Sequence, residues 1–151
     1  MEKEKIHGYK LANKSRRFIA LIVESLIILV VISVLLLLLG GSLSDMFESN
    51  ASFLGEIIAS AIVGAIFGAI FYPNFTGNIG HKIFNLKVIH IETGKDFNQA
   101  KDGAIRESLK AISNMLIIPS FWIFLDKNNQ NLYDKISKTI VVEKNNQKLL
   151  G

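Results

Sequence analysis

The stretch FIALIVESLIILVVISVLLLLL (Phe18–Leu39) decides the fold class of this 151-residue chain. Only Glu24, Ser25 and Ser33 interrupt its apolar side chains. A helix of this stretch is roughly 33 Å long, whereas the hydrocarbon core of a bilayer is about 30 Å thick. A helix in the core of a soluble protein is rarely apolar on all its faces for such a length. We therefore predict a first transmembrane helix at 18–39.

Two more apolar stretches follow. FLGEIIASAIVGAIFGAIFY (Phe53–Tyr72) is roughly 30 Å long as a helix, and we predict that it crosses the membrane as well. The third stretch, 109–125, is shorter and contains Pro119. A stretch of this length is more often re-entrant or interfacial than spanning, although it could cross a thin bilayer. The sequence leaves both arrangements open.

The basic residues indicate the orientation. Of the 17 Lys and Arg residues, six precede the first stretch and none lies in the connection 40–52. Six more follow the second stretch as far as Lys110, and five lie in the tail. Cytoplasmic segments of membrane proteins carry the excess of basic residues. We therefore expect a cytoplasmic N-terminus, a cytoplasmic connection at 73–108 and a cytoplasmic tail at 126–151, which favours a third stretch that enters the membrane and returns.

The cytoplasmic part contains two short strand-like segments. LKVIHIE (Leu86–Glu92) and TIVVE (Thr139–Glu143) are rich in β-branched residues and each ends at a turn signal. A single strand of this kind is marginal, so we predict that the two pair with each other. Apolar residues at helical spacing predict a helix over 97–113, with Asp96 as its N-cap.

Several functional classes are excluded or disfavoured by what the sequence lacks. It has no cysteine, which excludes disulfides and thiolate sites. Its three histidines, His7, His81 and His90, have no metal-ligand spacing, and we interpret them as surface or interfacial residues. No phosphate-binding loop or nucleophile elbow is present. We expect no metal, no cofactor and no enzymatic activity. The basic excess is typical of a surface beside anionic lipid, and no pattern favours nucleic-acid binding.

Three segments in order resemble the RDD family of small bacterial membrane proteins. The first is RRFIALIVE (Arg16–Glu24), which is similar to the start of the family's first helix. The second is GNIGHKIFNLKV (Gly77–Val88), which resembles a Gly-x-x-x-Gly-Lys-Lys segment that leads into a strand. The third is QNLYDKISKTIVV (Gln130–Val142), which is similar to the closing stretch. The resemblance implies a single membrane domain over 1–151 in the bacterial inner membrane, with several passes.

The same resemblance assigns the family's characteristic charges to Arg17, Glu24 and Asp134. Glu24 stands where the family has aspartate, and His81 replaces a usual lysine. Asn85 and Lys138 stand where glycine is common. Members of the family are often proposed to take part in transport, sometimes of cations, and others act as accessory membrane proteins.

Glu24 is the most informative residue of the chain. A charge at the centre of a membrane helix costs about 2.5–3.5 kcal/mol on insertion scales, so it usually faces a partner or a water-filled cavity. Arg17 lies on nearly the same face, about 10 Å away along the helix axis. One reading is a carboxylate that binds a proton or cation during translocation. The other is a structural ion pair, which Asp134, Lys110 or a lipid headgroup could complete.

Small residues in the second stretch indicate a helix contact. Ser60, Gly64 and Gly68 recur every four residues, and such series allow close approach of helices in lipid. The contact could be with the first helix of the same chain or with another subunit.

The expected fold is therefore a mainly α polytopic membrane protein with two transmembrane helices, a short third apolar helix and a small β-hairpin-like pair. Its expected partners are the lipid bilayer and either further copies of itself or another membrane protein. We predict a component for ion or small-solute translocation, and the alternative is a non-catalytic accessory subunit. The sequence names neither a solute nor a partner.

Overall fold

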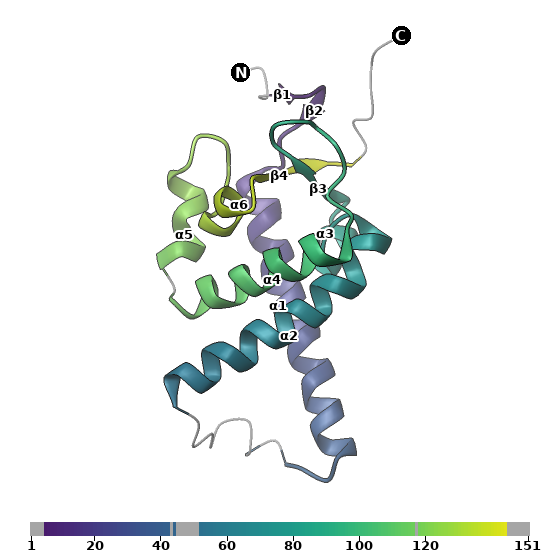
Figure 1. Cartoon of the computed structure of the whole chain (residues 1–151), viewed down its shortest axis with the longest axis vertical. Helices are drawn as coiled ribbons and strands as arrows, with labels where there is room; N and C mark the ends of the chain where they lie inside the picture. Colours follow the sequence, from purple (N-terminus) through teal and green to yellow (C-terminus); the bar gives the residue numbers. More distant parts are fainter. Residues whose placement is uncertain (1–4, 43, 45–51, 117, 145–151) are drawn as a thin grey trace.

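The computed structural model describes residues 5–42, 44, 52–116 and 118–144, with the side chains of 118–121 excepted. Within these residues the chain is mainly helical and carries two small two-stranded sheets. Both sheets lie at the end of the molecule where the described chain begins and ends, and the two long helices extend away from them (Figure 1).

The two long helices are α1 (Lys14–Leu38) and α2 (Phe53–Phe75). Helix α1 begins four residues before the predicted apolar stretch because the side chain of Asn13 caps it, accepting from the amide of Ser15 at 2.9 Å. Both helices are long and apolar enough to cross a membrane, and only 6% of the most apolar 18-residue window of each is buried. The core helix of a soluble protein would instead be mostly buried.

Helix α4 (Ala100–Met115) runs alongside α2 (Figure 1). It starts three residues later than predicted, and the predicted N-cap is wrong, since Gln99 occupies that position. Asp96 lies instead in extended backbone that bridges Ile89, where its carboxylate accepts from the Lys87 ammonium at 2.6 Å. Extended pairing with the sheet therefore keeps Asp96 away from the helix start.

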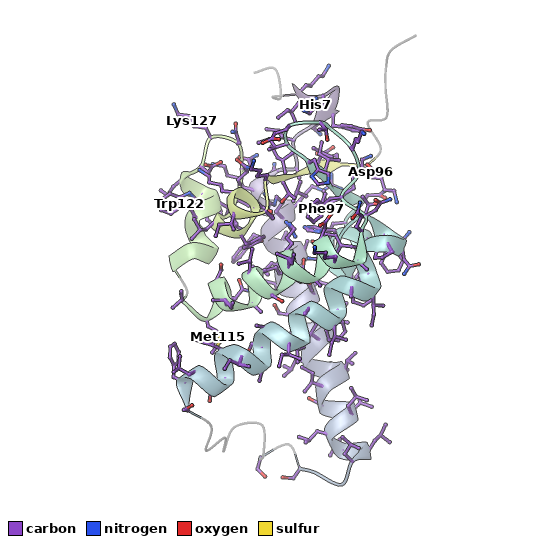
Figure 2. The ribbon with its side chains drawn as sticks, in the orientation of Figure 1. His7, Asp96, Phe97, Met115, Trp122 and Lys127 are labelled. Carbon is purple, nitrogen blue, oxygen red and sulfur yellow. The ribbon has the colours of Figure 1, made fainter. Side chains whose placement is uncertain are left out.

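The third apolar stretch is divided between the end of α4 and a second short helix, α5 (Ile118–Leu125). The end of α5 returns to the start of α1, where the rings of Phe124 and Phe18 are 5.8 Å apart. Lys14 also donates to the carbonyl of Phe124 at 3.1 Å. The chain therefore runs alongside α2 as α4 and then turns back as α5 toward the start of α1. Figure 2 shows Trp122 and Lys127 at the outer edge of this returning segment.

The predicted strand pair is confirmed. Strand β3 (Leu86–His90) pairs antiparallel with β4 (Thr139–Glu143), with Val88 opposite Val141. The short hairpin of β1 (Lys5–Ile6) and β2 (Tyr9–Lys10) lies against this pair through a bridge from Leu11 to Val142. The N-terminal segment, the middle connection and the tail therefore lie together at one end of the molecule.

Two short helices complete the chain. Helix α3 (Ile79–Ile83) follows α2, and α6 (Leu132–Ile136) precedes β4. Each starts at an asparagine that forms a capping box, Asn78 with His81 and Asn131 with Asp134. These two caps place His81 and Asp134 in the interior between α1 and α4.

Candidate functional site: a buried ion-pair network

Helix α4 buries its charged face. Its buried residues include Arg106, Glu107 and Lys110, whereas Ile105 and Leu116 on the opposite side are about half exposed. The apolar face that predicted the helix therefore points outward. This arrangement is the reverse of a surface helix in water and suits a helix whose outer face meets lipid.

Asp134 joins α1, α4 and α6. Its carboxylate is fully buried and pairs with Arg17 of α1 at 2.5 Å and with Arg106 of α4. It also accepts from the backbone amide of Asn131 at 2.9 Å. Burial raises the pKa of Asp134, but the charges of Arg17 and Arg106 outweigh burial and hold that pKa below its ordinary value. Asp134 is therefore ionised at neutral pH.

Glu24 belongs to the other end of the network. The ammonium of Lys110 pairs with the Glu24 carboxylate and, at 2.7 Å, with Glu107. Glu107 in turn accepts from Arg106 at 3.1 Å, which links this group to Asp134. Three cations thus alternate with three carboxylates, so the six charges sum to zero: Arg17, Arg106, Lys110, Glu24, Glu107 and Asp134.

Neutral side chains complete the network. The hydroxyl of Tyr72 on α2 donates to Glu107 at 2.7 Å and accepts from Arg106. The amide of Asn78 donates to Glu107 at 3.4 Å. Among the described residues no fully buried side-chain nitrogen or oxygen lacks a hydrogen-bond partner. The network therefore joins α1, α2, α4 and α6 with its buried groups satisfied, as burial of charge in a low-dielectric interior demands.

A small pocket lies beside Glu24. Its volume of about 10 Å³ is roughly room for one water molecule. Its polar lining comes from four helices or their caps (α1, α3, α4 and α6), and its apolar lining comes from α1 and α5. The lining residues are Arg17, Phe18, Leu21, Glu24, Asn78, His81, Lys110, Ile123, Asn131 and Tyr133. Within the described residues no group of His, Asp and Glu side chains forms a metal-binding cluster.

The structure brings together two of the three family charges directly. Arg17 pairs with Asp134, and both are buried. Glu24 shares the buried face of α1 with Arg17, but its ion-pair partner is Lys110. The distance along the helix explains this, since two turns separate Arg17 from Glu24 and α4 supplies a closer cation. Lys110 was one of the partners considered from sequence.

The small residues of α2 pack against α4 of the same chain. A Cβ atom on Gly68 would collide with the carbonyl oxygen of Gly103. A Cβ atom on Gly64 would lie 2.7 Å from the carbonyl oxygen of Glu107. Ser60, one turn before Gly64 in α2, is half-buried. Gly64 and Gly68 thus contact α4 of the same chain, a partner that the sequence analysis did not consider.

Sequence reasoning did not identify several residues of the site. Arg106 and Glu107 were not considered as network members, although their spacing with Gly103 and Lys110 follows one helix face. The interpretation of His81 as a surface or interfacial residue is wrong, because this side chain is 6% exposed and lines the pocket. Helix α3 buries His81 because Gly80 has no side chain and lets α3 lie close to α1. No local sequence pattern predicts such a contact.

Comparison with known proteins agrees with the resemblance seen in the sequence. The model of the RDD family matches residues 11–138, a range that contains every member of the ion-pair network. No curated protein and no solved structure matches the chain.

Proposed function

The chain belongs to the RDD family, and from that premise we propose that it is an integral membrane protein that contributes to the translocation of protons or other small ions. The observation that carries the proposal is the position of Glu24. Its carboxylate lies inside an apolar helix, beside a pocket with room for one water, and is held by a single ammonium that has a second carboxylate available.

This arrangement permits exchange of a positive charge. Lys110 contacts both Glu24 and Glu107, so it can remain paired with Glu107 when a proton or small cation takes its place at Glu24. No buried charge is then left without a partner, which would otherwise cost several kcal/mol. Arg17 and Asp134 have a different role in this proposal, because they hold the cytoplasmic part against α1 without taking part in the exchange.

The orientation belongs to the same proposal. Helices α1 and α2 cross the inner membrane of a bacterium, and α4 with α5 enters and returns. The N-terminus, the β3–β4 pair and the tail then lie in the cytoplasm, which agrees with the basic residues on these segments. The inward-facing charges and outward-facing apolar residues of α4 support its burial in the bilayer.

The alternative function is that of an accessory subunit. Helix α2 packs on α4, and the far half of α1 is left exposed, with Leu26, Val30 and Leu37 each more than half accessible. Two spans arranged in this way enclose little space for a pathway. A helix of another membrane protein could cover this part of α1, and the chain would then modulate that protein.

Flux through proteoliposomes tests the first function. The purified chain is reconstituted, a pH or cation gradient is imposed, and dye signals from inside the vesicles are followed for the wild type and for Glu24→Gln. We expect the Gln variant to fold and to lose flux, because the amide cannot take up a proton or balance a cation.

The matched control is Glu92→Gln, which removes a carboxylate whose ion pair with Lys138 is mostly exposed. It should retain both folded yield and flux. Loss of folded yield in Glu24→Gln alone would show that Glu24 has a structural role. Wild-type protein without flux would favour the accessory function, and cross-linking in native membranes followed by native mass spectrometry would then identify the partner.

A further inference from the structure

His81 is a buried side chain to which the exchange at Glu24 assigns no role. It lies on α3, which presses directly against α1. A Cβ atom on Gly80 would collide with the carbonyl oxygen of Ala20 and would lie 3.1 Å from the Cβ of Glu24. The absence of a side chain at Gly80 thus allows α3 to carry His81 to the pocket that Glu24 also lines.

The capping box of α3 determines which ring nitrogen carries the proton. The Nδ1 atom of His81 accepts from the backbone amide of Asn78 at 3.4 Å, while the Asn78 side chain accepts from the amide of His81 at 2.8 Å. A ring nitrogen that accepts a hydrogen bond has no proton of its own. The neutral imidazole therefore carries its proton on Nε2, and the backbone of Asn78 keeps it in that tautomer.

His81 and Glu24 each offer one polar atom to the pocket. Within the described residues, Nε2 of His81 and Oε1 of Glu24 form no hydrogen bond with protein. Since no fully buried side-chain nitrogen or oxygen in that part of the chain lacks a partner, each of these two atoms retains some accessible surface, and both residues line the pocket. The space has room for about one water molecule, which needs two or more polar partners.

We propose that the pocket binds one ordered water molecule, which accepts a hydrogen bond from Nε2–H of His81 and donates one to Oε1 of Glu24. His81 is then a positioning residue. Its donor polarises the water, and a water so polarised donates a stronger hydrogen bond to the carboxylate. This favours the ionised form of Glu24. The inference rests on the proposed function only in taking Glu24 as the carboxylate that binds the proton or cation.

Other charged and titratable groups also surround the imidazole. Arg17 on α1 and Arg106 and Lys110 on α4 are the charges that act on it, and Glu24 on α1 and Tyr133 on α6 line the same pocket. The six members of the ion-pair network are already paired with one another, so a change at His81 alters the donor to the water and leaves these pairs in place. Near Arg17 and Lys110, a second proton on the imidazole would add another positive charge.

The first measurement concerns the tautomer in the wild-type protein. Nitrogen NMR of the 15N-histidine-labelled chain in nanodiscs separates Nδ1 from Nε2, and His81 is assigned as the signal that disappears in a His81→Asn sample or, failing that, in His81→Gln. We expect a neutral ring at pH 7 with the proton on Nε2. A proton on Nδ1, or a doubly protonated ring, would overturn the proposal.

The second measurement concerns Glu24 itself. Infrared difference spectra against pH give the midpoint at which Glu24 is protonated, identified as the carboxyl band that Glu24→Gln lacks. His81→Asn retains an acceptor near the position of Nδ1 but has no donor at Nε2. We expect its midpoint to rise by about one pH unit, a tenfold change in proton affinity. His81→Gln places an amide donor near Nε2 and should restore the wild-type midpoint.

His90→Asn is the matched control, because His90 packs on Phe97 and does not line the pocket. An unchanged midpoint in His81→Asn, or an equal rise in His81→Gln, would overturn the proposal. If His81→Asn does not fold, the test rests on two other results. A wild-type proton on Nε2 and a wild-type midpoint in His81→Gln support the proposal, and any other result for either contradicts it. A midpoint shift together with a wild type that shows no flux would contradict the proposed function but support the water site. Flux in the wild type without a midpoint shift would support the proposed function but contradict the water site.

Discussion

At the scale of single residues, Asp134 has the largest predicted effect on stability. It is the buried carboxylate that Arg17 and Arg106 share, so Asp134→Asn leaves the buried guanidinium of Arg17 without a countercharge and leaves Arg106 with Glu107 alone. Breaking a buried pair from one side costs about 3–5 kcal/mol. We expect a loss of that size in the free energy of unfolding, measured by denaturant titration in detergent.

The control for Asp134 is again a carboxylate-to-amide change at the surface. Glu92→Gln breaks a pair whose side chains are about two-thirds exposed, and such pairs contribute about 0.2–1 kcal/mol. Equal losses in the two variants would contradict the assignment of Asp134 as the centre of the network.

The same residue predicts how stability depends on pH. The folded-state pKa of Asp134 lies below its ordinary value of 3.8, because the pull of Arg17 and Arg106 exceeds the effect of burial. Its contribution is therefore complete above about pH 4 and is lost as pH falls through the lower, folded-state pKa. Thermal unfolding midpoints should show a steep acid decline in the wild type and a shallower one in Asp134→Asn. Parallel acid declines would argue against the ionised pair.

Lys138 and Asn85 show why the related family favours glycine at these two positions. Both have left-handed backbones, with φ of 52° at Lys138 and 55° at Asn85. A left-handed conformation costs about 1–2 kcal/mol for most residues, less for asparagine and nothing for glycine. Lys138→Gly should therefore raise the thermal midpoint and Asn85→Gly should raise it less, both by differential scanning fluorimetry. The surface pair of Lys138 with Glu92 is too exposed to reverse this order.

At the scale of elements, the contact between α2 and α4 depends on glycine. Gly68 faces the backbone of Gly103 so closely that a methyl group has no room. Gly68→Ala should push the two helices apart and lower the free energy of unfolding by about 1–3 kcal/mol, the usual cost of overpacking.

The control for this contact is Ile66→Ala, on the outward face of the same helix, where the side chain is 54% exposed. It should change stability in detergent little. Both variants are compared by denaturant titration, and a Gly68→Ala protein as stable as the wild type would mean that the helices are not in such close contact.

Helix α4 also shows what a sequence pattern cannot predict. The apolar residues of α4 predicted a helix correctly, but they did not reveal which face is buried. A helical repeat has the same period in water and in lipid, whereas the buried face differs. Arg106 and Glu107 were missed for this reason.

At the scale of the whole molecule, the return of α5 to the start of α1 makes a prediction about topology. The chain has no cysteine, so single cysteines can be introduced without a background of native thiols. Lys127→Cys and Lys138→Cys should react with a maleimide that cannot cross the membrane only in inverted vesicles. Ser42→Cys, beyond the far end of α1, should react in intact cells. Labelling of Lys127→Cys from the side of Ser42→Cys would mean that the third stretch spans the membrane.

The sequence by itself determined the two long apolar helices, the pairing of β3 with β4 and the family. The helices and the strand pair follow from local composition and periodicity, and the family follows from three motifs in order along the chain. Helix α1 needs only its apolar length, and the strands need only β-branched residues between turns. The buried position of Arg17 and Glu24 on one face also follows from helical spacing.

Only the tertiary structure decided which charges meet. Glu24 pairs with Lys110, 86 residues away, because α2 and α4 approach through glycines and bring α4 beside α1. His81 enters the interior because Gly80 lets α3 touch α1. Such contacts depend on the distance between backbones, to which no residue pattern along the chain is sensitive, and in a low-dielectric interior each buried charge must find its partner there.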